Sequence, residues 1–262
     1  MERRATDQSL RKKELIVFDL DGTLAESKSA MDAEMASLLK DLLHKKKVAV
    51  ISGGRFSQFQ KQFLASLRCP PSLLEKLFLF PTSSTTFYRF QEGEWRQVYA
   101  ENLTEDEKQK IRRAFAEAFR RTSYRQPAKI YGEVIEDRGT QITFSALGQE
   151  APVAEKKKWN SKHDVRDALM EVLRAQLPEF EVRSGGLTSI DVTRKGIDKA
   201  YGIRQIVRHT GIPLEQMLFV GDAIYPGGND YAAVRTGIDY VRVAGPEETK
   251  AFIRAILGRE EN

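Results

Sequence analysis

LIVFDLDGTL, residues 15–24, is the stretch that decides the fold of this 262-residue chain. Residues 15–18 form a continuous apolar run, which is typical of a short strand buried on both faces of a parallel sheet. The run ends in Asp19 and Asp21, and two neighbouring carboxylates at a buried strand end are costly unless something neutralises them. Ligands of open α/β sheets bind just outside such strand ends. A divalent cation together with a phosphate would therefore account for both carboxylates, and Gly22 permits the sharp turn behind them.

The same stretch resembles the signature of the haloacid-dehalogenase (HAD) superfamily, whose members are Mg-dependent phosphotransferases. The resemblance rests on FDLDGTL, residues 18–24, where both aspartates and the Gly-Thr-Leu sequence are in place. It implies that Asp19 is a nucleophile and that Asp21 is a general acid and base.

Two further apolar runs, each followed by polar residues, predict more strands of the same sheet. One leads into Ser52 and two glycines, and a later one leads into Asp222. Hydroxyl and N–H groups at a strand end suit phosphate binding. Because parallel strands present their carboxyl ends at one edge, we expect these side chains to lie beside Asp19. A helix that begins near residue 197 would bring Lys199 to the same edge.

The regular β/α alternation of residues 1–81 resumes at residue 189, whereas residues 82–188 lack it. That middle segment contains a predicted hairpin, two predicted helices and further strands, which indicates an α+β sheet with helices on one side. The predicted fold class is therefore α/β: a Rossmann-like core with a parallel sheet, plus an inserted α+β cap domain. Residues 1–81 and 189–262 are expected to form the core, and residues 82–188 the cap.

Composition and charge favour a globular protein that binds neither membranes nor nucleic acid. Hydrophobic residues make up 41% and charged residues 30% of the chain, and no segment approaches the roughly 20 apolar residues of a membrane span. The basic N-terminal segment lacks the apolar centre of a secretory signal. The single cysteine, Cys69, permits no internal disulfide, so we expect a cytoplasmic location. The net charge of +5 suits anionic ligands, but the basic residues are interspersed with acidic ones.

The expected strand-end residues form a chemically complete set for phosphoryl transfer. Mg²⁺ prefers oxygen ligands, which the side chains of Asp19 and Asp222 and the backbone carbonyl of Asp21 would supply. The metal and Lys199 would offset the repulsion between an anionic nucleophile and an anionic phosphate. Asp19 would form an aspartyl-phosphate. Asp21 would first protonate the leaving oxygen and then deprotonate the attacking water or hydroxyl.

Four segments in the middle and C-terminal parts of the chain resemble eukaryotic-type phosphomannomutases. They are DRGTQITFSALGQ (137–149), GGLTSIDV (185–192), GIDKAYGIR (196–204) and GDAIYPGGNDY (221–231). The resemblance implies a HAD core with a mobile C2-type cap inserted between the second and third core motifs. It also permits a homodimer formed through the cap.

The resemblance assigns roles position by position. The assigned residues are catalytic Asp19, Asp21 and Lys199; metal-binding Asp19, Asp21 and Asp222, with Asn229 and Asp230 behind them; and substrate-binding Lys28, Arg138, Lys156, Ser189 and Asp191. The motif at residues 52–55, Ser-Gly-Gly-Arg, departs from the mutases and resembles sugar-phosphate phosphatases, and it adds Ser52 to the expected catalytic residues. Lys28 and Lys156 stand where the family has arginines, and Gln149 stands where another cap arginine is expected. Lysine binds phosphate only as a point charge and glutamine is uncharged, so the second phosphate site that a mutase needs is weakened.

These departures favour a Mg²⁺-dependent phosphatase that hydrolyses a small phosphomonoester, such as a sugar phosphate, through an aspartyl-phosphate intermediate. The alternative is a phosphomannomutase that interconverts hexose 6-phosphate and hexose 1-phosphate, which the segment PGGND at residues 226–230 supports. A third hypothesis is a non-catalytic phosphosugar-binding protein, but such a protein would not require the complete charged set. All three hypotheses share a small phosphorylated molecule as the binding partner.

Overall fold

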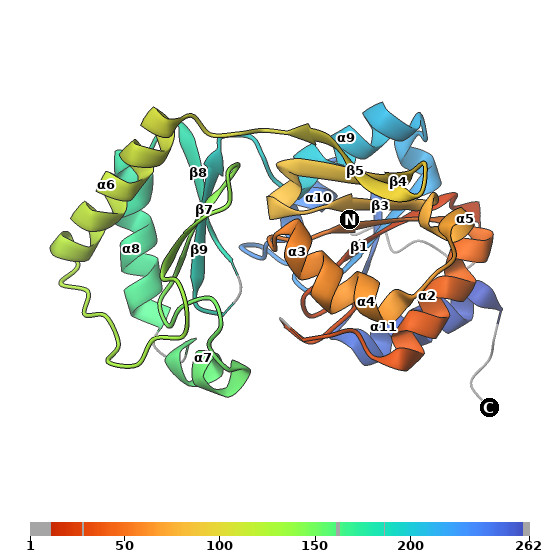
Figure 1. Ribbon diagram of the computed structural model, residues 1–262, viewed down its shortest axis with the longest axis horizontal. Helices are drawn as coiled ribbons and strands as arrows, with labels where there is room; N and C mark the ends of the chain where they lie inside the picture. The colour runs from red at the N-terminus through yellow and green to blue at the C-terminus, as the bar shows by residue number, and fades with distance from the viewer. Residues whose placement is uncertain (1–11, 28, 161–162, 186, 259–262) are drawn as a thin grey trace. The chain divides into compact units, whose positions relative to one another are not determined.

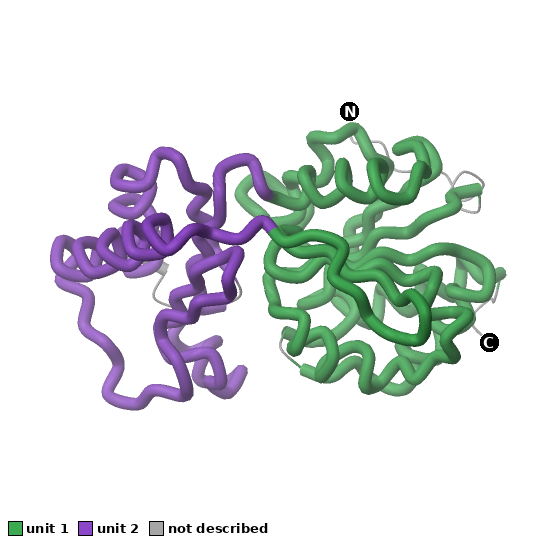
Figure 2. The backbone as a smooth tube through the Cα atoms, turned by 45° about the horizontal axis from the view of Figure 1, so that its top comes forward, with its two compact units in different colours: residues 1–100, 198–262 green, residues 101–197 purple. Residues whose placement is uncertain are grey.

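The computed structural model (Figure 1) describes the whole chain except residues 1–11, 28, 161–162, 186 and 259–262. The chain divides into two compact units (Figure 2). Residues 1–100 and 198–262 form the first unit, and residues 101–197 form the second. The second unit is therefore inserted into the sequence of the first. Among the described residues, no helix is long and apolar enough to cross a lipid bilayer.

A seven-stranded sheet in the order β11-β10-β1-β2-β3-β4-β5 forms the centre of the first unit (Figure 1). Strands β11 to β3 of this order run parallel, while β4 and β5 run antiparallel to their neighbours. The strands are β1 (Leu15–Asp19), β2 (Lys47–Ile51), β3 (Leu77–Phe80), β4 (Thr86–Gln91), β5 (Glu94–Ala100), β10 (Met217–Gly221) and β11 (Asp239–Arg242). Phe18 of β1 lies opposite Val50 on one side and Val220 on the other, so three strands end level at one edge.

Hydrophobic side chains cover both faces of this sheet, because successive residues of a strand point to opposite faces. Ile16 and Phe18 of β1 lie in a buried cluster with residues of α2 and α11. Leu15 and Val17 lie in a second buried cluster with residues of α9. The helices of this unit are α2 (Ala33–Lys45), α3 (Phe56–Phe59), η1 (Gln60–Leu64), α4 (Ala65–Leu67), α5 (Pro71–Leu74), η2 (Thr82–Ser84), α9 (Lys199–Thr210), η3 (Leu214–Gln216), α10 (Tyr231–Val234) and α11 (Pro246–Leu257).

The second unit is a four-stranded antiparallel sheet in the order β6-β7-β9-β8, with helices on one face. Its elements are α6 (Glu105–Arg121), β6 (Ile135–Asp137), β7 (Ile142–Ser145), α7 (Val153–Asn160), α8 (His163–Gln176), β8 (Phe180–Ser184) and β9 (Ser189–Arg194). Phe144 of β7 and Ile190 of β9 lie in one buried cluster with Phe115 of α6 and Leu173 of α8. Their strand neighbours Thr143 and Asp191 point to the opposite, polar face.

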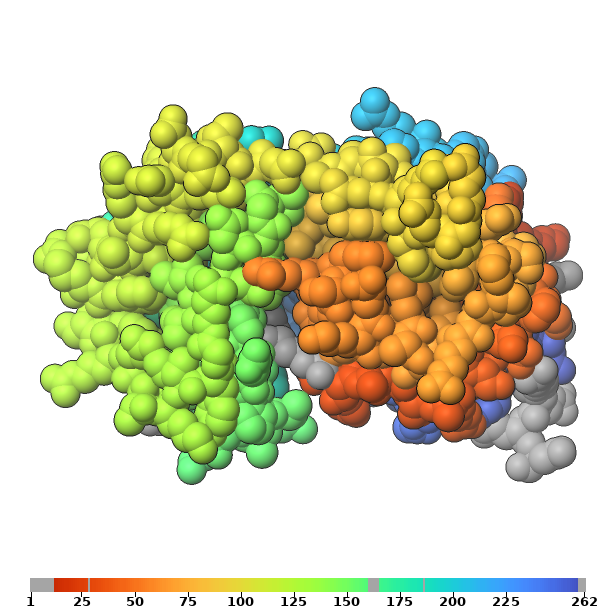
Figure 3. Space-filling view, in the orientation of Figure 1, coloured from red at the N-terminus to blue at the C-terminus, as the bar shows by residue number. Residues whose placement is uncertain are grey.

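The fold class predicted from the sequence is confirmed, but the structure draws the boundaries at residues 100/101 and 197/198 rather than at 81/82 and 188/189. The hairpin β4–β5 continues the first sheet, because β4 pairs with β3 and Phe87 stacks on Phe80 with ring centroids 4.5 Å apart. In Figure 3 this yellow hairpin lies directly against the orange surface of the same unit. Strand β9, which we expected in the core, pairs instead with β7 and β8 of the second unit.

Three consecutive residues other than glycine adopt the left-handed conformation directly after β3. The angle φ is +50° at Thr82, +58° at Ser83 and +72° at Ser84, and left-handed backbone costs such residues about 1–2 kcal/mol each. Thr82 N donates a hydrogen bond to the carbonyl of Gly54 (2.8 Å), and Ser83 N donates to that of Ser52 (2.9 Å). This left-handed turn is therefore tied to the loop that follows β2.

Replacing Ser83 with glycine should stabilise the protein. The Ser83 side chain is half-buried, and glycine adopts a positive φ without steric penalty. We expect the free energy of unfolding, measured by urea denaturation, to rise by about 1 kcal/mol. Ser57→Gly in the exposed part of α3 is the matched control and should lower stability, since glycine disfavours a helix. Equal or lower stability of Ser83→Gly would show that the turn is not strained.

Candidate active site

The ends of β1, β2 and β10 bring four of the expected side chains to one edge of the first sheet. Asp19 is the last residue of β1, Ser52 follows β2, and Asp222 follows β10. Asp21 lies in the turn after β1, where its Oδ2 accepts a hydrogen bond from Ser52 Oγ at 3.3 Å. The structure therefore places Asp21 of the first motif beside the hydroxyl of the second.

The turn after β1 approaches Asp222 closely because Gly22 has no side chain. Gly22 has a φ of +91°, and a Cβ atom at this position would lie 2.7 Å from Asp222 Oδ2. The next residue, Thr23, donates a hydrogen bond from Oγ1 to Asp222 Oδ1 at 3.4 Å. Gly22 and Thr23 thus orient a carboxylate that lies about 200 residues away in the sequence.

Lys199 connects the carboxylates of two different segments. It is the first residue of α9, a helix that begins where Asp198 Oδ1 accepts a hydrogen bond from Tyr201 N (2.8 Å). Lys199 Nζ donates to Asp19 Oδ1 at 2.5 Å and also to Asp230 Oδ1. All three side chains of this bridge are buried. The sequence predicted that Asp230 lies near the metal ligands, but it did not reveal the direct contact with Lys199.

Three carboxylates and one ammonium group share this small volume, so negative charge is in excess. Burial raises the pKa of Asp19 well above its usual range; Lys199 opposes this rise, whereas Asp230 and Asp222 add to it. Burial also raises the pKa of Asp222, and Asp230 adds to that rise. Burial would lower the pKa of Lys199, but the neighbouring Asp19 and Asp230 raise it above its ordinary value. A bound cation would favour ionised Asp19 and Asp222.

The same carboxylates fit a divalent cation. One oxygen each of Asp19, Asp222 and Asp230 lies within 4.8 Å of the others. Asp19 Oδ2 is buried and has no hydrogen-bond partner in the described part of the chain, which is uncommon for a buried polar atom and suits a metal ligand. Asp230 already accepts hydrogen bonds from Lys199 and from Ala223 N. Asp19 and Asp222 are therefore best placed to bind a cation directly, with Asp230 behind them and Asn229 next to it in the sequence.

Two cap residues expected to bind substrate, Arg138 and Lys156, both contact Gln149 in the second unit. Arg138 Nη2 donates a hydrogen bond to Gln149 Oε1 (3.3 Å), and Lys156 Nζ donates to the backbone carbonyl of Gln149 (3.3 Å). Glu136 Oε2 accepts a hydrogen bond from Arg138 Nε at 2.6 Å. The structure thus groups two cations around Gln149. Lys28, the remaining basic residue of the expected set, lies outside the described residues.

Ser189 and Asp191 form part of a second polar group, on the face of the sheet opposite α6 and α8. Asp191 Oδ1 accepts a hydrogen bond from Thr143 Oγ1 (2.7 Å), to which Gln141 Nε2 donates in turn (2.7 Å). Gln141 and Thr143 are not among the site residues predicted from the sequence. The alternation of polar and apolar residues over 141–145 was the available signal, since it predicts one polar face of a strand.

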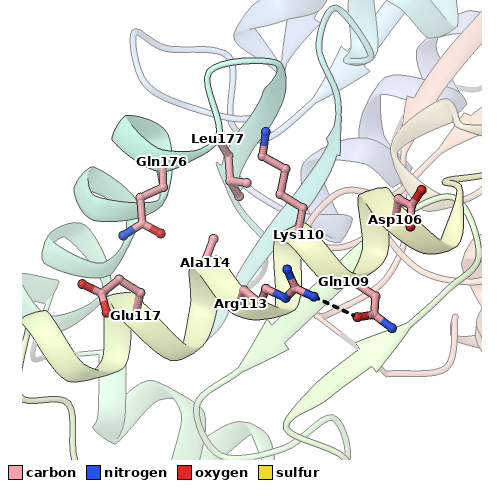
Figure 4. A pocket seen from close by; sticks show the side chains of 8 residues that line it. All are labelled: Asp106, Gln109, Lys110, Arg113, Ala114, Glu117, Gln176 and Leu177. Atoms are coloured by element: carbon pink, nitrogen blue, oxygen red, sulfur yellow. Dashed lines mark hydrogen bonds between the residues drawn. The ribbon is translucent and has the colours of Figure 1, made fainter.

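A separate groove of about 730 Å³ lies along α6 near the C-terminal end of α8 (Figure 4). Its lining residues are Asp106, Gln109, Lys110, Arg113, Ala114, Glu117, Gln176 and Leu177. Acidic and basic side chains are dispersed along this groove, and none of the residues identified from the sequence lines it. The strand-end cluster is therefore the candidate active site.

Comparison with known proteins gives consistent matches along almost the whole chain. The family model described as "Eukaryotic phosphomannomutase" matches residues 35–259. A phosphomannomutase of Encephalitozoon cuniculi is 27% identical over 95% of this chain and 98% of its own length. Phosphomannomutase 1 of Homo sapiens is 26% identical over 86% of each chain.

Solved structures with the same fold are more distant in sequence. The IMP-nucleotidase of Plasmodium falciparum superposes with a TM-score of 0.71 at 17% identity, covering 95% of this chain and 70% of that one. The C-terminal domain of the Candida albicans trehalose-6-phosphate phosphatase superposes with a TM-score of 0.67 at 15% identity, covering 99% of both chains. At these identities the superpositions show that the fold is shared.

Divalent-cation binding should weaken on acidification at a pH above the usual range of carboxyl groups. Binding requires ionised ligands, and the raised pKa values of Asp19 and Asp222 let protons compete with the cation. We expect Mg²⁺ affinity, measured by calorimetry, to fall about 10-fold or more from pH 7.5 to about pH 5.5, with proton release on binding. Asp222→Asn should abolish binding, whereas Asp106→Asn in the separate groove should not. Equal affinity at both pH values would contradict the assignment.

Proposed function

The chain belongs to the eukaryotic phosphomannomutase family of the HAD superfamily, and from this we propose that it is a phosphomutase that interconverts a hexose 6-phosphate and a hexose 1-phosphate. Family membership makes it an enzyme of phosphoryl transfer, a phosphomutase or a phosphohydrolase. The observation that carries the proposal is the cluster of buried Asp19, Lys199 and Asp230 with half-buried Asp222, in a chain that matches phosphomannomutases almost end to end. The weakened cap residues favoured a phosphatase, but these matches support the mutase better.

Asp19 is the proposed nucleophile. Its attack forms a bond between the carboxylate oxygen and phosphorus and breaks the bond between phosphorus and the sugar oxygen, which yields an aspartyl-phosphate. Lys199, which contacts Asp19, is placed to reduce the repulsion between the carboxylate and the incoming phosphate. Mg²⁺ held by Asp19, Asp222 and the backbone carbonyl of Asp21 would supply the remaining positive charge.

Asp21 is the proposed acid and base. It protonates the leaving sugar oxygen, and it later removes the proton from the hydroxyl that takes up the phosphoryl group. The hydrogen bond from Ser52 Oγ to Asp21 Oδ2 holds the carboxyl group in place between these two transfers. One carboxyl group can serve both half-reactions because the second transfer reverses the first.

A mutase must bind a sugar bisphosphate in two orientations, so it needs a second phosphate site away from Asp19. We propose that Arg138, Lys156 and Gln149 provide it. Arg138 and Lys156 supply positive charge, and Gln149 Nε2 is a buried donor without a partner in the described part of the chain. An amide donor beside two cations would replace some of the hydrogen bonds that a third cation would make.

A phosphatase is the second candidate, and the environment of Arg138 favours it. Glu136 accepts a hydrogen bond from Arg138 Nε, which neutralises part of the charge available to a distal phosphate. A hydrolase does not retain a bisphosphate, so it would tolerate this loss. Mg²⁺ as the metal, a small phosphorylated substrate, a cytoplasmic location and a homodimer formed through the cap remain predictions under either candidate.

Sugar-phosphate assays separate the two candidates. Purified protein with Mg²⁺ would receive mannose 6-phosphate, mannose 1-phosphate or glucose 6-phosphate, with and without glucose 1,6-bisphosphate. We expect interconversion of 1- and 6-phosphates that depends on the bisphosphate, because the bisphosphate can transfer one phosphoryl group to Asp19 and leave as a hexose monophosphate. Accumulation of inorganic phosphate without bisphosphate, in the absence of interconversion, would overturn the mutase and establish the phosphatase. Asp19→Asn is the control that should abolish either activity.

Asp21→Asn should separate metal binding from chemistry. The proposed metal ligand at this position is the backbone carbonyl, so Mg²⁺ affinity should stay within about 3-fold of wild type. Loss of the acid and base should lower kcat by about 10²–10⁴-fold. Asp167→Asn on the exposed side of α8 is the matched control. Wild-type turnover of Asp21→Asn would remove Asp21 from the mechanism.

A further inference from the structure

Helix α9, which carries Lys199, approaches the left-handed turn at residues 82–84 closely. A Cβ atom on Gly202 would lie 2.2 Å from Ser84 Oγ, 2.9 Å from Ser84 Cβ and 3.0 Å from Ile51 Cδ1. Rotation of the Ser84 hydroxyl would relieve the first contact. The second contact involves an atom fixed to the backbone, so it would require a backbone movement. Helix α9 therefore occupies its position because residue 202 has no side chain.

Serine is an unfavourable residue at position 84 of this turn. It adopts a φ of +72°, and its Oγ is buried without a hydrogen-bond partner in the described part of the chain. The backbone conformation and the unsatisfied hydroxyl are both unfavourable for serine. The turn is nevertheless fixed from the other side, where Tyr99 OH donates to the Ser84 carbonyl at 2.9 Å. The contribution of the Ser84 side chain is thus its steric contact with Gly202.

This contact joins two parts of the candidate active site. Gly202 lies three residues after Lys199, so both residues are on the same side of α9. The turn that contains Ser84 is bonded through Ser83 N to the carbonyl of Ser52, whose hydroxyl contacts Asp21. The turn therefore lies between the loop that carries Ser52 and the helix that carries Lys199.

We propose that Gly202 and Ser84 are positioning residues, whose close contact sets the place of Lys199 relative to Asp19 and to the phosphate. The inference rests on the proposed role of Lys199, and it adds two residues that lie outside the expected catalytic set. A side chain at residue 202 would push α9 away from the turn. Lys199 Nζ would then leave hydrogen-bond distance of Asp19, and its hold on phosphate would weaken.

A set of four variants tests the contact. Inorganic phosphate binding with Mg²⁺ present, measured by calorimetry, is the readout that does not depend on which reaction is catalysed. Gly202→Ala should weaken phosphate binding and lower kcat by about 10-fold or more. Ser84→Gly should weaken binding by about 2- to 3-fold, since α9 loses its support. The double variant Gly202→Ala/Ser84→Gly should recover to within about 3-fold of wild type, because glycine at residue 84 removes the clash. Arg204→Ala on the exposed side of α9 should bind as wild type.

Dependence on Lys199 is tested in a Lys199→Ala background. If Gly202 acts through Lys199, Gly202→Ala should change phosphate affinity by less than about 2-fold in that background. A loss as large as in the wild-type background would show a general structural defect and overturn the proposal. A double variant no better than Gly202→Ala would also overturn it, as would wild-type behaviour of Gly202→Ala.

Two further outcomes are decisive. If Gly202→Ala does not fold, a double variant that folds and binds phosphate supports the contact, whereas a double variant that also fails to fold overturns it. If Lys199→Ala binds phosphate and turns over like wild type, the proposed role of Lys199 fails and this inference fails with it. A defective Lys199→Ala beside a normal Gly202→Ala would reject the inference alone.

Discussion

The bridge that Lys199 forms between Asp19 and Asp230 is the interaction on which the rest of the site depends. Three carboxylates at the end of a sheet repel one another, and burial strengthens that repulsion because little solvent screens it. One ammonium group in contact with two of them offsets part of this repulsion. Lys199 lies 180 residues from Asp19 in the sequence. The site therefore exists only after β1, β10 and α9 have packed together.

Local sequence was sufficient to predict the strand-end residues, because an apolar run that stops at Asp19 marks both the strand and its end. It was insufficient for contacts that depend on the path of a loop. The bond between Lys199 and Asp230 is such a contact, since the loop after β10 could have placed Asp230 in several orientations. The left-handed conformation of residues 82–84 could not be predicted from the sequence either, because serine and threonine rarely adopt this conformation.

The two misplaced boundaries have a common physical origin. Alternating and apolar patterns predict that a segment is a strand, but they do not say which sheet it joins. The hairpin β4–β5 joins the first sheet because Phe87 finds an aromatic partner there in Phe80. Strand β9 joins the second because Ile190 and Val192 complete the cluster beneath α6 and α8. Partner choice depends on side chains from other segments, so it becomes visible only in the folded chain.

The fit between Gly202 and Ser84 has a consequence for how this protein can change over evolutionary time. On the proposed contact, a larger residue at position 202 is tolerated only after position 84 has become glycine, because the reverse order passes through an intermediate in which the new side chain clashes with Ser84. The two positions are 118 residues apart in the sequence (202 minus 84). Even so, the residue present at one position limits which residues are acceptable at the other. Homologues should therefore exchange residues at these positions as a pair, and a residue acceptable in one member of the family would be harmful when transplanted alone into another.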